Sequence, residues 1–389
     1  MHVLFVSDVY FPRVNGVSTS IRTFREDLQA QGVTTTLVAP QYPGQAADVQ
    51  ADVVRVPSGG VPRDPEDRRL HWQALQTTLE RLASQQRFDL VHIHTPFIAH
   101  YGAVKFARRH RLPVVATYHT FFEEYLHHYV PLLPRRIGRA IARRFTLSQC
   151  NDVQALIAPS EPMLNMLKTY GVQQRIEVIP TGMPAERFAA GDGPRFRREH
   201  GIPLDRPLLL YVGRVAHEKN IEFLMHSFVE VRRTRPDALL VIAGEGPARE
   251  SLQQLAVTLG IARDTVFVGY LDRLRGLTDC YASADVFVFA SRTETQGLVL
   301  LEAMAQGRTV VSTAMLGTAS ILKPGCGAVV APEELKGFSD AILKVLADPA
   351  GSAQLGVRAR EYAQGWASSL LAGRMAQLYS ELTVTHPAA

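Results

Sequence analysis

The chain has 389 residues and a net charge of +5, and its composition is 46% hydrophobic and 20% charged. This length suits two domains of about 150 to 200 residues each, and the ordinary composition excludes a disordered chain. The charge by itself specifies no class of partner. The three widely spaced cysteines, Cys150, Cys280 and Cys326, fit neither a disulfide framework nor a zinc site, and a reducing compartment explains them most simply.

The N-terminal sequence MHVLFVSD predicts a buried strand rather than a secretion signal, because it has neither a charged leading region nor a cleavage site. No apolar run approaches the roughly 18 residues that a membrane span needs. We therefore expect a protein that is soluble or that lies on a membrane surface.

Short apolar runs alternate with amphipathic stretches through the first half of the chain. A helix is expected at about 18–31, and strands are expected at 2–7, 34–40, 89–95, 113–119, 155–160 and 175–182. Continuous apolar and β-branched strands separated by helices predict a parallel sheet that is covered on both faces.

Residues 183–205 are rich in glycine, proline and charge and predict a linker. The alternation then restarts, with strands expected at 207–213, 238–244, 265–270, 284–291, 309–313 and 327–332. The predicted fold class is α/β, with two doubly wound domains at 1–185 and 206–365. A last helical stretch at about 354–382 either stays with the second domain or crosses back, so that about 366–389 packs on the first.

Ligands bind beyond the carboxyl ends of strands in open α/β sheets, so the loops after strands are the candidate sites. After the first strand, Asn15 and Gly16 form a turn before a helix that Ser18 or Thr19 could cap. A glycine loop leading into a helix N-terminus can bind an anion. An ordinary loop and cap explain the same residues.

The sequence GRVAHEKN follows the first strand of the second domain. Gly213 permits a close approach of the backbone, and Arg214 and Lys219 offer a planar fork and a point charge to a diphosphate. The alternative is two solvated cations, with Lys219 paired to Glu218.

The sequence RTETQGLVLLEAMAQG (292–307) holds two carboxylates that are separated by seven residues. Glu294 lies in the loop after a strand, and Gln296, Gly297 and Leu298 open a helix that carries Glu302 about one turn in. Free N–H groups at such a helix start suit an anion or a sugar hydroxyl. The alternative is one capping and one exposed glutamate.

Histidines gather near two strand ends of the first domain. His92 and His94 share one face of a strand, and His119 ends the next. Zinc binding by His92 and His94 lacks a third ligand, so core or surface histidines are favoured. The chain contains no Asp-x-Asp motif for a metal–diphosphate complex.

Together these motifs resemble the retaining glycosyltransferases of family 4, which have the two-domain GT-B fold. The similarity is carried by GR…EKN, by the Glu294-x7-Glu302 pattern, and by NGV (15–17) and TYHT (117–120), in matching order and spacing. It spans about residues 2–365 and is more specific for the family than for the substrate.

The resemblance implies a role for each motif residue. Arg214 and Lys219 would neutralise the donor diphosphate, Glu302 would bind the ribose, and Gly16 would let its loop approach the phosphates. The donor base would lie against the loop around Val268–Tyr270. Contacts to the transferred sugar would come from His119, Glu294, and the residues Thr295, Gln296, Gly297, Leu298 and Val299.

Such enzymes retain the anomeric configuration and need no metal or other cofactor, with the nucleotide sugar as donor substrate. The leaving diphosphate is thought to take the acceptor proton, so the protein acts by orientation and electrostatics. The two glutamates are then not a hydrolase pair flanking one bond.

The acceptor segments resemble the branch that glucosylates diacylglycerol. His119, Tyr125 and His127 keep the spacing of that branch, whereas His128 departs from it. We therefore expect glucose transfer from UDP-glucose to diacylglycerol. Another UDP-hexose or GDP-mannose, a phospholipid or soluble saccharide acceptor, an epimerase, and a binding protein without transfer activity remain alternatives.

The segment Arg135–Arg144 reads as a basic amphipathic helix. Five arginines surround a stripe of Ile137, Ile141 and Phe145. This pattern favours binding to an anionic membrane at about 1 kcal/mol per arginine, although an ordinary surface helix with its stripe on the core would look the same. We expect a cytoplasmic enzyme peripheral on the inner face of the membrane, with no nucleic-acid partner.

Overall fold

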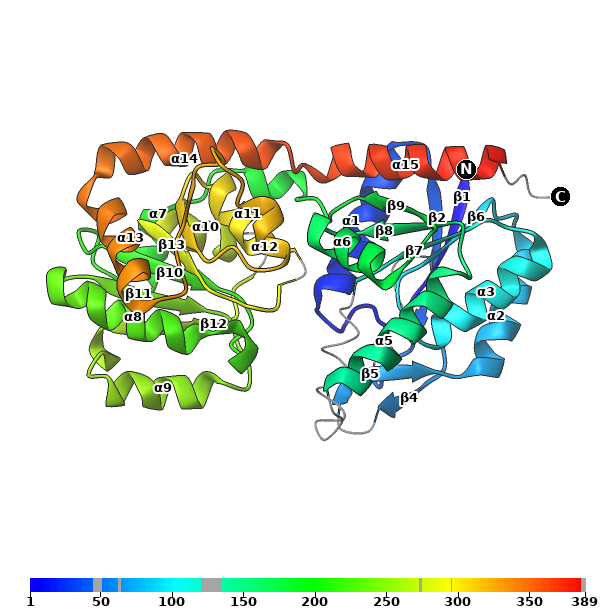
Figure 1. The fold of residues 1–389 in the computed structure, drawn as a ribbon, viewed down its shortest axis with the longest axis horizontal. Coiled ribbons are helices and arrows are strands. Elements are labelled where there is room, and N and C mark those ends of the chain that lie inside the picture. Colours follow the sequence, from blue (N-terminus) through cyan, green and yellow to red (C-terminus); the bar gives the residue numbers. More distant parts are fainter. Residues whose placement is uncertain (45–50, 62–63, 120–134, 273–274, 295, 386–389) are drawn as a thin grey trace. The chain divides into compact units, whose positions relative to one another are not determined.

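The computed structural model describes residues 1–44, 51–61, 64–119, 135–272, 275–294 and 296–385 (Figure 1). The chain forms two compact units. The first consists of Met1–Gly182 with Ser368–Ala389, and the second is Met183–Ala367.

The first unit is built on a parallel sheet with the strand order β3-β2-β1-β6-β7-β8-β9. The expected strands are present, and β3 is an additional one. The bounds are β1 His2–Val6, β2 Thr34–Pro40, β3 Val53–Val56, β6 Leu90–Ile93, β7 Val114–Thr117, β8 Ala155–Ala158 and β9 Arg175–Val178. A separate antiparallel hairpin, β4 Ser58–Val61 and β5 Asp64–Leu70, was also not predicted.

Alternating residues of β1 supply the cores on the two faces of this sheet. Val3 and Phe5 belong to one buried cluster with helices α1 and α15, whereas Leu4 and Val6 belong to another with α2 and α3. The helices of this unit are α1 Gly16–Ala30, α2 Trp72–Gln85, α3 Ile98–His110, α5 Arg135–Cys150, α6 Glu161–Tyr170 and α15 Ser368–Thr385. Both faces are covered, as parallel sheets require.

The expected C-terminal helical stretch is in fact two helices. Helix α14 (Pro349–Gln364) belongs to the second unit, and α15 packs against α1 in the first. Leu371, Met375 and Tyr379 of α15 are each at most 5% exposed, because they complete the core on the α1 face of the sheet. The chain therefore crosses back to the first unit.

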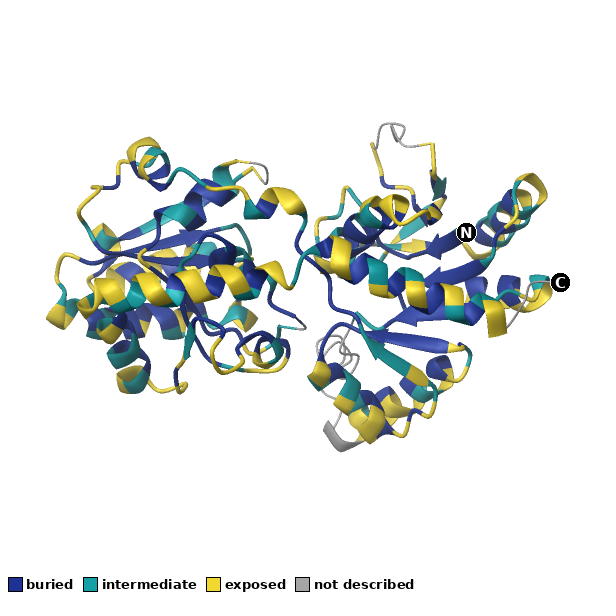
Figure 2. Ribbon diagram, turned by 90° about the horizontal axis from the view of Figure 1, so that it is seen from above, coloured by how far each residue is buried: buried dark blue, intermediate teal, exposed yellow. Residues whose placement is uncertain are grey.

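The second unit has a parallel sheet with the order β12-β11-β10-β13-β14-β15. Its strands are buried beneath helices that turn an exposed face outward (Figure 2). The bounds are β10 Leu208–Val212, β11 Leu239–Ala243, β12 Thr265–Gly269, β13 Val286–Phe289, β14 Thr309–Ser312 and β15 Ala328–Val330. The helices are α7 Gly193–Glu199, α8 Ile221–Thr234, α9 Arg249–Thr258, α10 Gly276–Ser283, α11 Leu298–Ala305, α12 Gly317–Ile321, α13 Leu335–Ala347 and α14, with 3₁₀ turns η1 Ala185–Phe188, η2 His217–Lys219 and η3 Ala262–Asp264.

The expectation of a linker at 183–205 was wrong. This segment contains η1 and α7 and is part of the second unit. Phe196 is 1% exposed and joins the main core, and Arg197 donates hydrogen bonds to the carbonyl of Ser283. Glycine and proline here mark short connections and a helix start rather than a solvated tether.

We predict that Phe196→Ala lowers the free energy of unfolding of the second unit by about 3–5 kcal/mol, because it leaves a cavity in a closed core. Urea denaturation followed by circular dichroism measures this change. Val257→Ala on α9, where the side chain is 61% exposed, is the control and should change stability by no more than about 0.5 kcal/mol. Equal stabilities of the two variants would restore the linker interpretation.

Candidate active site

The carboxyl ends of β10 and β11 meet so closely that glycine is required. Gly244 follows β11 with φ 128°, and a Cβ atom there would lie 2.0 Å from the carbonyl oxygen of Gly213. The amide of Gly213 donates to the carbonyl of Ala243 at 3.0 Å, and the amide of Gly244 donates to that of Gly269 at 2.9 Å. Three strand ends are thereby fixed side by side around an open loop edge.

An ion pair joins the loops that follow β10 and β13. Lys219 Nζ lies 2.6 Å from Glu294 Oε1, and the two side chains are 18% and 20% exposed. Lys219 therefore pairs with Glu294 and not with Glu218, the alternative that the sequence suggested. The neighbouring Asn220 donates through Nδ2 to the carbonyl of Ala290 at 3.1 Å, which ties the same two loops together.

Arg214 lies in the same loop after β10 as Lys219, and its side chain is exposed. Within the described part of the chain, its side chain makes no ion pair. Its carbonyl accepts a hydrogen bond of 3.1 Å from the hydroxyl of Tyr211, which fixes the backbone of the loop. Burial first, and then the negative charges of Glu294 and Glu218, raise the pKa of Tyr211 well above its usual value, so this hydroxyl stays a donor.

Helix α11 begins at this edge, as expected. Its N-cap is Gly297 in the left-handed conformation (φ 88°), and no side chain caps the helix, so N–H groups of the first turn remain for a ligand. The amide of Gly317 donates to the carbonyl of Glu294 at 2.9 Å and positions the preceding loop. Gln296 is buried, Leu298 and Val299 are half-buried, and Thr295 lies outside the described residues.

Glu302 is held by two residues that the sequence did not reveal. The hydroxyl of Tyr281 on α10 donates to its Oε2 at 2.7 Å, and Arg187 Nε lies 3.5 Å from its Oε1. Burial and the charge of Glu302 raise the pKa of Tyr281 well above its usual value, so the hydroxyl keeps its proton. No motif marks Tyr281 or Arg187, because both reach Glu302 only through the fold.

An exposed aromatic ring lies just beyond β12, and an ion pair that follows β11 lies next to it in the sheet. Val268 is half-buried on the strand, and Tyr270 just beyond it is 80% exposed. Glu245 and Arg249 pair beside Gly269, in the loop after β11. The run Gly-Glu-Gly after a strand was the signal for this loop and was overlooked.

In the first unit, the helix after β1 is capped differently from the expectation. The cap is Asn15, whose Oδ1 accepts from the amide of Ser18 at 2.8 Å, rather than Ser18 or Thr19. A Cβ atom on Gly16 would meet nothing within 4 Å, so the protein itself does not require glycine there. The space next to Gly16 is therefore open to a ligand.

His92, His94 and His119 form a row in which His92 and His94 are buried and His119 is half-buried. The ring centroids of His92 and His94 are 4.0 Å apart, and His94 Nδ1 lies 3.4 Å from His119 Nε2. Both ring nitrogens of His92 are engaged, by the hydroxyls of Tyr379 at 2.6 Å and Thr117 at 2.7 Å. Burial lowers the pKa of His119 to about 4, so its ring is neutral near pH 7. Histidine in the core is therefore the correct interpretation of His92 and His94.

Within the described residues, no group of three or more histidine, cysteine or acidic side chains is placed to hold a metal ion. Tyr125 and His127 lie outside the described residues, as do all of 120–134. In the described part of the chain, every helix is too short or too polar to span a bilayer.

Comparison with known proteins identifies the class of this fold and site. Residues 14–187 match the model of glycosyltransferase family 4, and residues 192–366 match that of the group 1 glycosyl transferases. The chain belongs to the family 4 glycosyltransferases and has the GT-B fold.

Two curated relatives named for lipid substrates and one solved structure are similar to this chain. The chain is 32% identical to alpha-monoglucosyldiacylglycerol synthase of Streptococcus pneumoniae over 80% of this chain and 71% of that protein. It is 33% identical to the GDP-mannose-dependent alpha-(1-6)-phosphatidylinositol monomannoside mannosyltransferase of Mycolicibacterium smegmatis over 54% and 58% of the two chains. Sucrose-phosphate synthase of Thermosynechococcus elongatus has the same fold, with a TM-score of 0.80 at 22% identity over 99% of each chain.

A buried carboxyl at the end of β1 gives a prediction about pH. Asp8 accepts from the hydroxyl of Thr95 at 2.8 Å and from the amide of Ala99 at 3.1 Å, yet burial dominates and raises its pKa from 3.8 to about 6. The folded chain therefore holds this proton more tightly than the unfolded chain. The resulting stability is fully present below pH 3.8 and is lost as the pH rises through about 6.

We predict that the stability of the wild type relative to Asp8→Asn falls by about 2 kcal/mol as the pH is raised from about 4 to 7. Urea denaturation of both proteins at several pH values measures this difference. A difference that does not change with pH would contradict the assignment.

Proposed function

We propose that the protein transfers glucose from UDP-glucose to diacylglycerol in a membrane, with retention of the anomeric configuration and without a metal ion. The observation that carries the donor half is the pairing of Lys219 with Glu294 beside the exposed Arg214. The acceptor half rests on the similarity to the monoglucosyldiacylglycerol synthase and on the surface of α5.

Binding of a nucleotide sugar would separate the two residues of the ion pair. In the absence of donor, Lys219 and Glu294 neutralise each other at 2.6 Å. A diphosphate would take Lys219 together with the guanidinium of Arg214, and the freed carboxylate of Glu294 would accept hydrogen bonds from sugar hydroxyls. Each group thus exchanges one charge-assisted partner for another, with little net cost of desolvation.

The nucleoside part of the donor has partners on the same unit. Glu302 is the ribose ligand, and its carboxylate is oriented before binding by Tyr281 and Arg187. The base would lie near Val268 and Tyr270. Preorganised groups of this kind accelerate transfer because they need not rearrange as charge develops on the leaving diphosphate.

Retention follows from a proton transfer that no side chain performs in this proposal. The leaving diphosphate oxygen takes the proton of the acceptor hydroxyl while the new glycosidic bond forms on the same face. Arg214, Lys219 and the start of α11 stabilise the negative charge that remains on the diphosphate. His119, neutral near pH 7, is the hydrogen-bonding partner of the transferred sugar.

Helix α5 supports an acceptor in a membrane. Ile137 and Ile141 are 52% and 47% exposed, so the start of the apolar stripe does not lie on the core of the described structure. Arg139, Arg143 and Arg144 are exposed on the same helix. An apolar stripe flanked by arginines suits the interface of an anionic leaflet, and this supports the proposal that the enzyme acts on the cytoplasmic face of the membrane.

The relative named for GDP-mannose and a phosphatidylinositol mannoside supports a second candidate, in which a mannosyl group is moved to a glycosylated phospholipid. The two candidates share Arg214, Lys219 and Glu294, and differ in base and acceptor. A panel of UDP-glucose, UDP-galactose and GDP-mannose crossed with diacylglycerol, phosphatidylinositol and soluble sugars, read by nucleotide release and product analysis, separates them. Absence of lipid-dependent UDP release with diacylglycerol in anionic liposomes would refute the first candidate, and donor binding without any product would favour a binding protein.

We predict that Lys219→Ala and Glu294→Ala each lower kcat/KM by about 30- to 1000-fold, because each loses one charge-assisted contact worth roughly 2–4 kcal/mol in the transition state. The exposed Lys323→Ala is the matched control for the loss of a lysine and should retain activity. Near-normal kcat/KM in both site variants would refute the assigned donor site.

For membrane binding, we predict that replacing Ile137 and Ile141 with aspartate weakens sedimentation with phosphatidylglycerol liposomes, and that replacing Arg139, Arg143 and Arg144 with alanine does so most at low salt. Donor binding, measured by calorimetry, should be unchanged. Because Arg143 Nε also donates to the carbonyl of Tyr170 at 2.9 Å, a variant that leaves Arg143 in place checks for structural damage.

A double variant on the second unit, Arg263→Ala with Arg358→Ala, removes two other exposed arginines and is the control for charge alone. If this control lost as much liposome binding as the α5 variants, the membrane surface would have to be assigned elsewhere.

A further inference from the structure

A large hollow lies at the edge of the second sheet opposite to the donor site. Residues at the amino ends of three strands line it: Pro207 before β10, Asp285 before β13, and Thr309 at the start of β14. Its volume is about 750 Å³, and the ends of α13 and the length of α14 close its other side. None of its lining residues belongs to the loops that carry Arg214, Lys219 and Glu294.

Two arginines in this hollow have main-chain carbonyls as their hydrogen-bond partners among the described residues. Arg308 donates to the carbonyls of Ala284 at 2.9 Å and Gln306 at 3.0 Å, and Arg360 on α14 donates to the carbonyl of Ala305 at 3.2 Å. Within the described residues, neither forms an ion pair with a carboxylate. Since a guanidinium has five N–H donors, each retains donors for a ligand.

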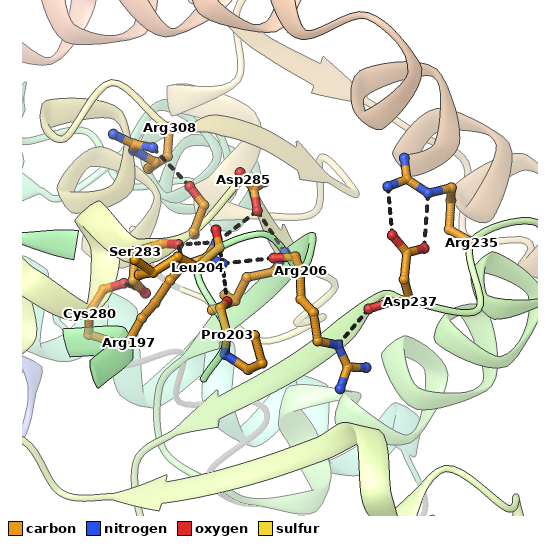
Figure 3. A network of polar contacts seen from close by, with 12 residues as sticks. Arg197, Pro203, Leu204, Arg206, Arg235, Asp237, Cys280, Ser283, Asp285 and Arg308 are labelled. Atoms are coloured by element: carbon orange, nitrogen blue, oxygen red, sulfur yellow. Dashed lines mark hydrogen bonds and ion pairs between the residues drawn. The ribbon is translucent and has the colours of Figure 1, made fainter. Parts of the chain in front are cut away.

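The arginines around them are paired with acids, and Figure 3 shows one of these pairs, between Arg235 and Asp237. Arg206 pairs with Asp264 at 2.7 Å, Arg235 with Asp237 at 3.0 Å, and Arg197 with Asp285 at 2.9 Å. In the same view, the guanidinium of Arg308 reaches only a main-chain oxygen. The unmatched charge is therefore confined to Arg308 and Arg360.

Arg308 and Arg360 lie close enough for their positive charges to repel each other. Arg308 is half-buried, and burial lowers its pKa most; the charge of Asp285 opposes this effect, and the charges of Arg360 and Arg197 add to it by less. Asp285 is already paired with Arg197, and the remaining lining acids, Asp205 and Glu361, are exposed. A bound anion would relieve this repulsion.

We propose that this hollow binds a small soluble phosphate ester, with Arg308 and Arg360 as the ligands of its phosphate. Two planar guanidinium groups match the oxygens of one phosphate, which accepts paired hydrogen bonds from each. The volume suits a ligand of metabolite size. Val345, Leu346 and Pro349 form an apolar wall against which the carbon skeleton of the ester packs.

The hollow does not share a lining residue with the proposed donor site, but one side chain connects the two regions. Gln306, which also lines the hollow, donates to the carbonyls of Arg187 and Ala189 at 3.0 and 2.9 Å. Arg187 in turn contacts Glu302. A ligand in the hollow would therefore lie next to the segment that supports the proposed ribose ligand, Glu302. The experiment below measures ligand binding and does not depend on enzyme activity.

Isothermal calorimetry with glycerol 3-phosphate and with inorganic phosphate tests the site. The reference protein carries Arg214→Ala and Lys219→Ala, so that the donor site cannot supply the signal. We expect saturable binding of glycerol 3-phosphate that Arg360→Ala weakens by roughly tenfold or more, because hydrogen bonds to charged groups are lost. Arg358→Ala, an exposed arginine on the same helix outside the hollow, is the matched control and should leave the affinity unchanged.

Arg308→Lys is the second variant, because it keeps the charge but loses the fork, and thermal melting verifies that each variant folds. Binding that is absent, or equal in Arg360→Ala and Arg358→Ala, would overturn the proposal. Sedimentation with phosphatidylglycerol vesicles is run in parallel. Vesicle binding that depends on Arg360 without binding of glycerol 3-phosphate would assign the hollow to a lipid surface and would also overturn it.

Discussion

The ion pair between Lys219 and Glu294 is the interaction on which the site depends. The two residues are 75 positions apart, yet β10 and β13 are neighbouring parallel strands, so the loops at their carboxyl ends lie together. Asn220 and the Tyr211 hydroxyl fix the same loops by hydrogen bonds to main-chain carbonyls. A pair that is partly shielded from water is stable without donor, and its two members offer opposite charges to the diphosphate and the sugar of a donor.

The two edges of the second sheet treat charge in different ways. At the carboxyl edge, Lys219 and Glu302 each have an internal partner that orients them, and Arg214 is exposed beside them. At the amino edge, paired arginines and aspartates surround two arginines that form no ion pair within the described part of the chain. One sheet thus carries the proposed donor site at one edge and a separate pair of arginines at the other.

The fold was largely predictable because its strands are continuous apolar runs and its helices are amphipathic. The strand β2 begins and ends as expected, and the remaining expected strands differ by only a few terminal residues. The prediction failed where composition was misleading. Residues 183–205 have the glycine and proline of a linker, but Phe196 and Arg197 bind them to the second core. The four-residue strand β3 was missed, as were β4 and β5, whose sequences SGGV and DPEDRRL contain glycine, proline and charge instead of an apolar run.

The sequence by itself determined the family, the two-domain α/β organisation and the donor motif, because motif spacing and apolar periodicity are local properties of a chain. The tertiary structure decided which charges meet. In the fold, Lys219 pairs with Glu294 and not with Glu218. Tyr281 and Arg187 contact Glu302. Helix α15 packs on the first unit through Tyr379 and its neighbours. It also left Arg308 and Arg360 beside an open hollow. Such contacts join residues up to hundreds of positions apart, and only strand order and packing can specify them.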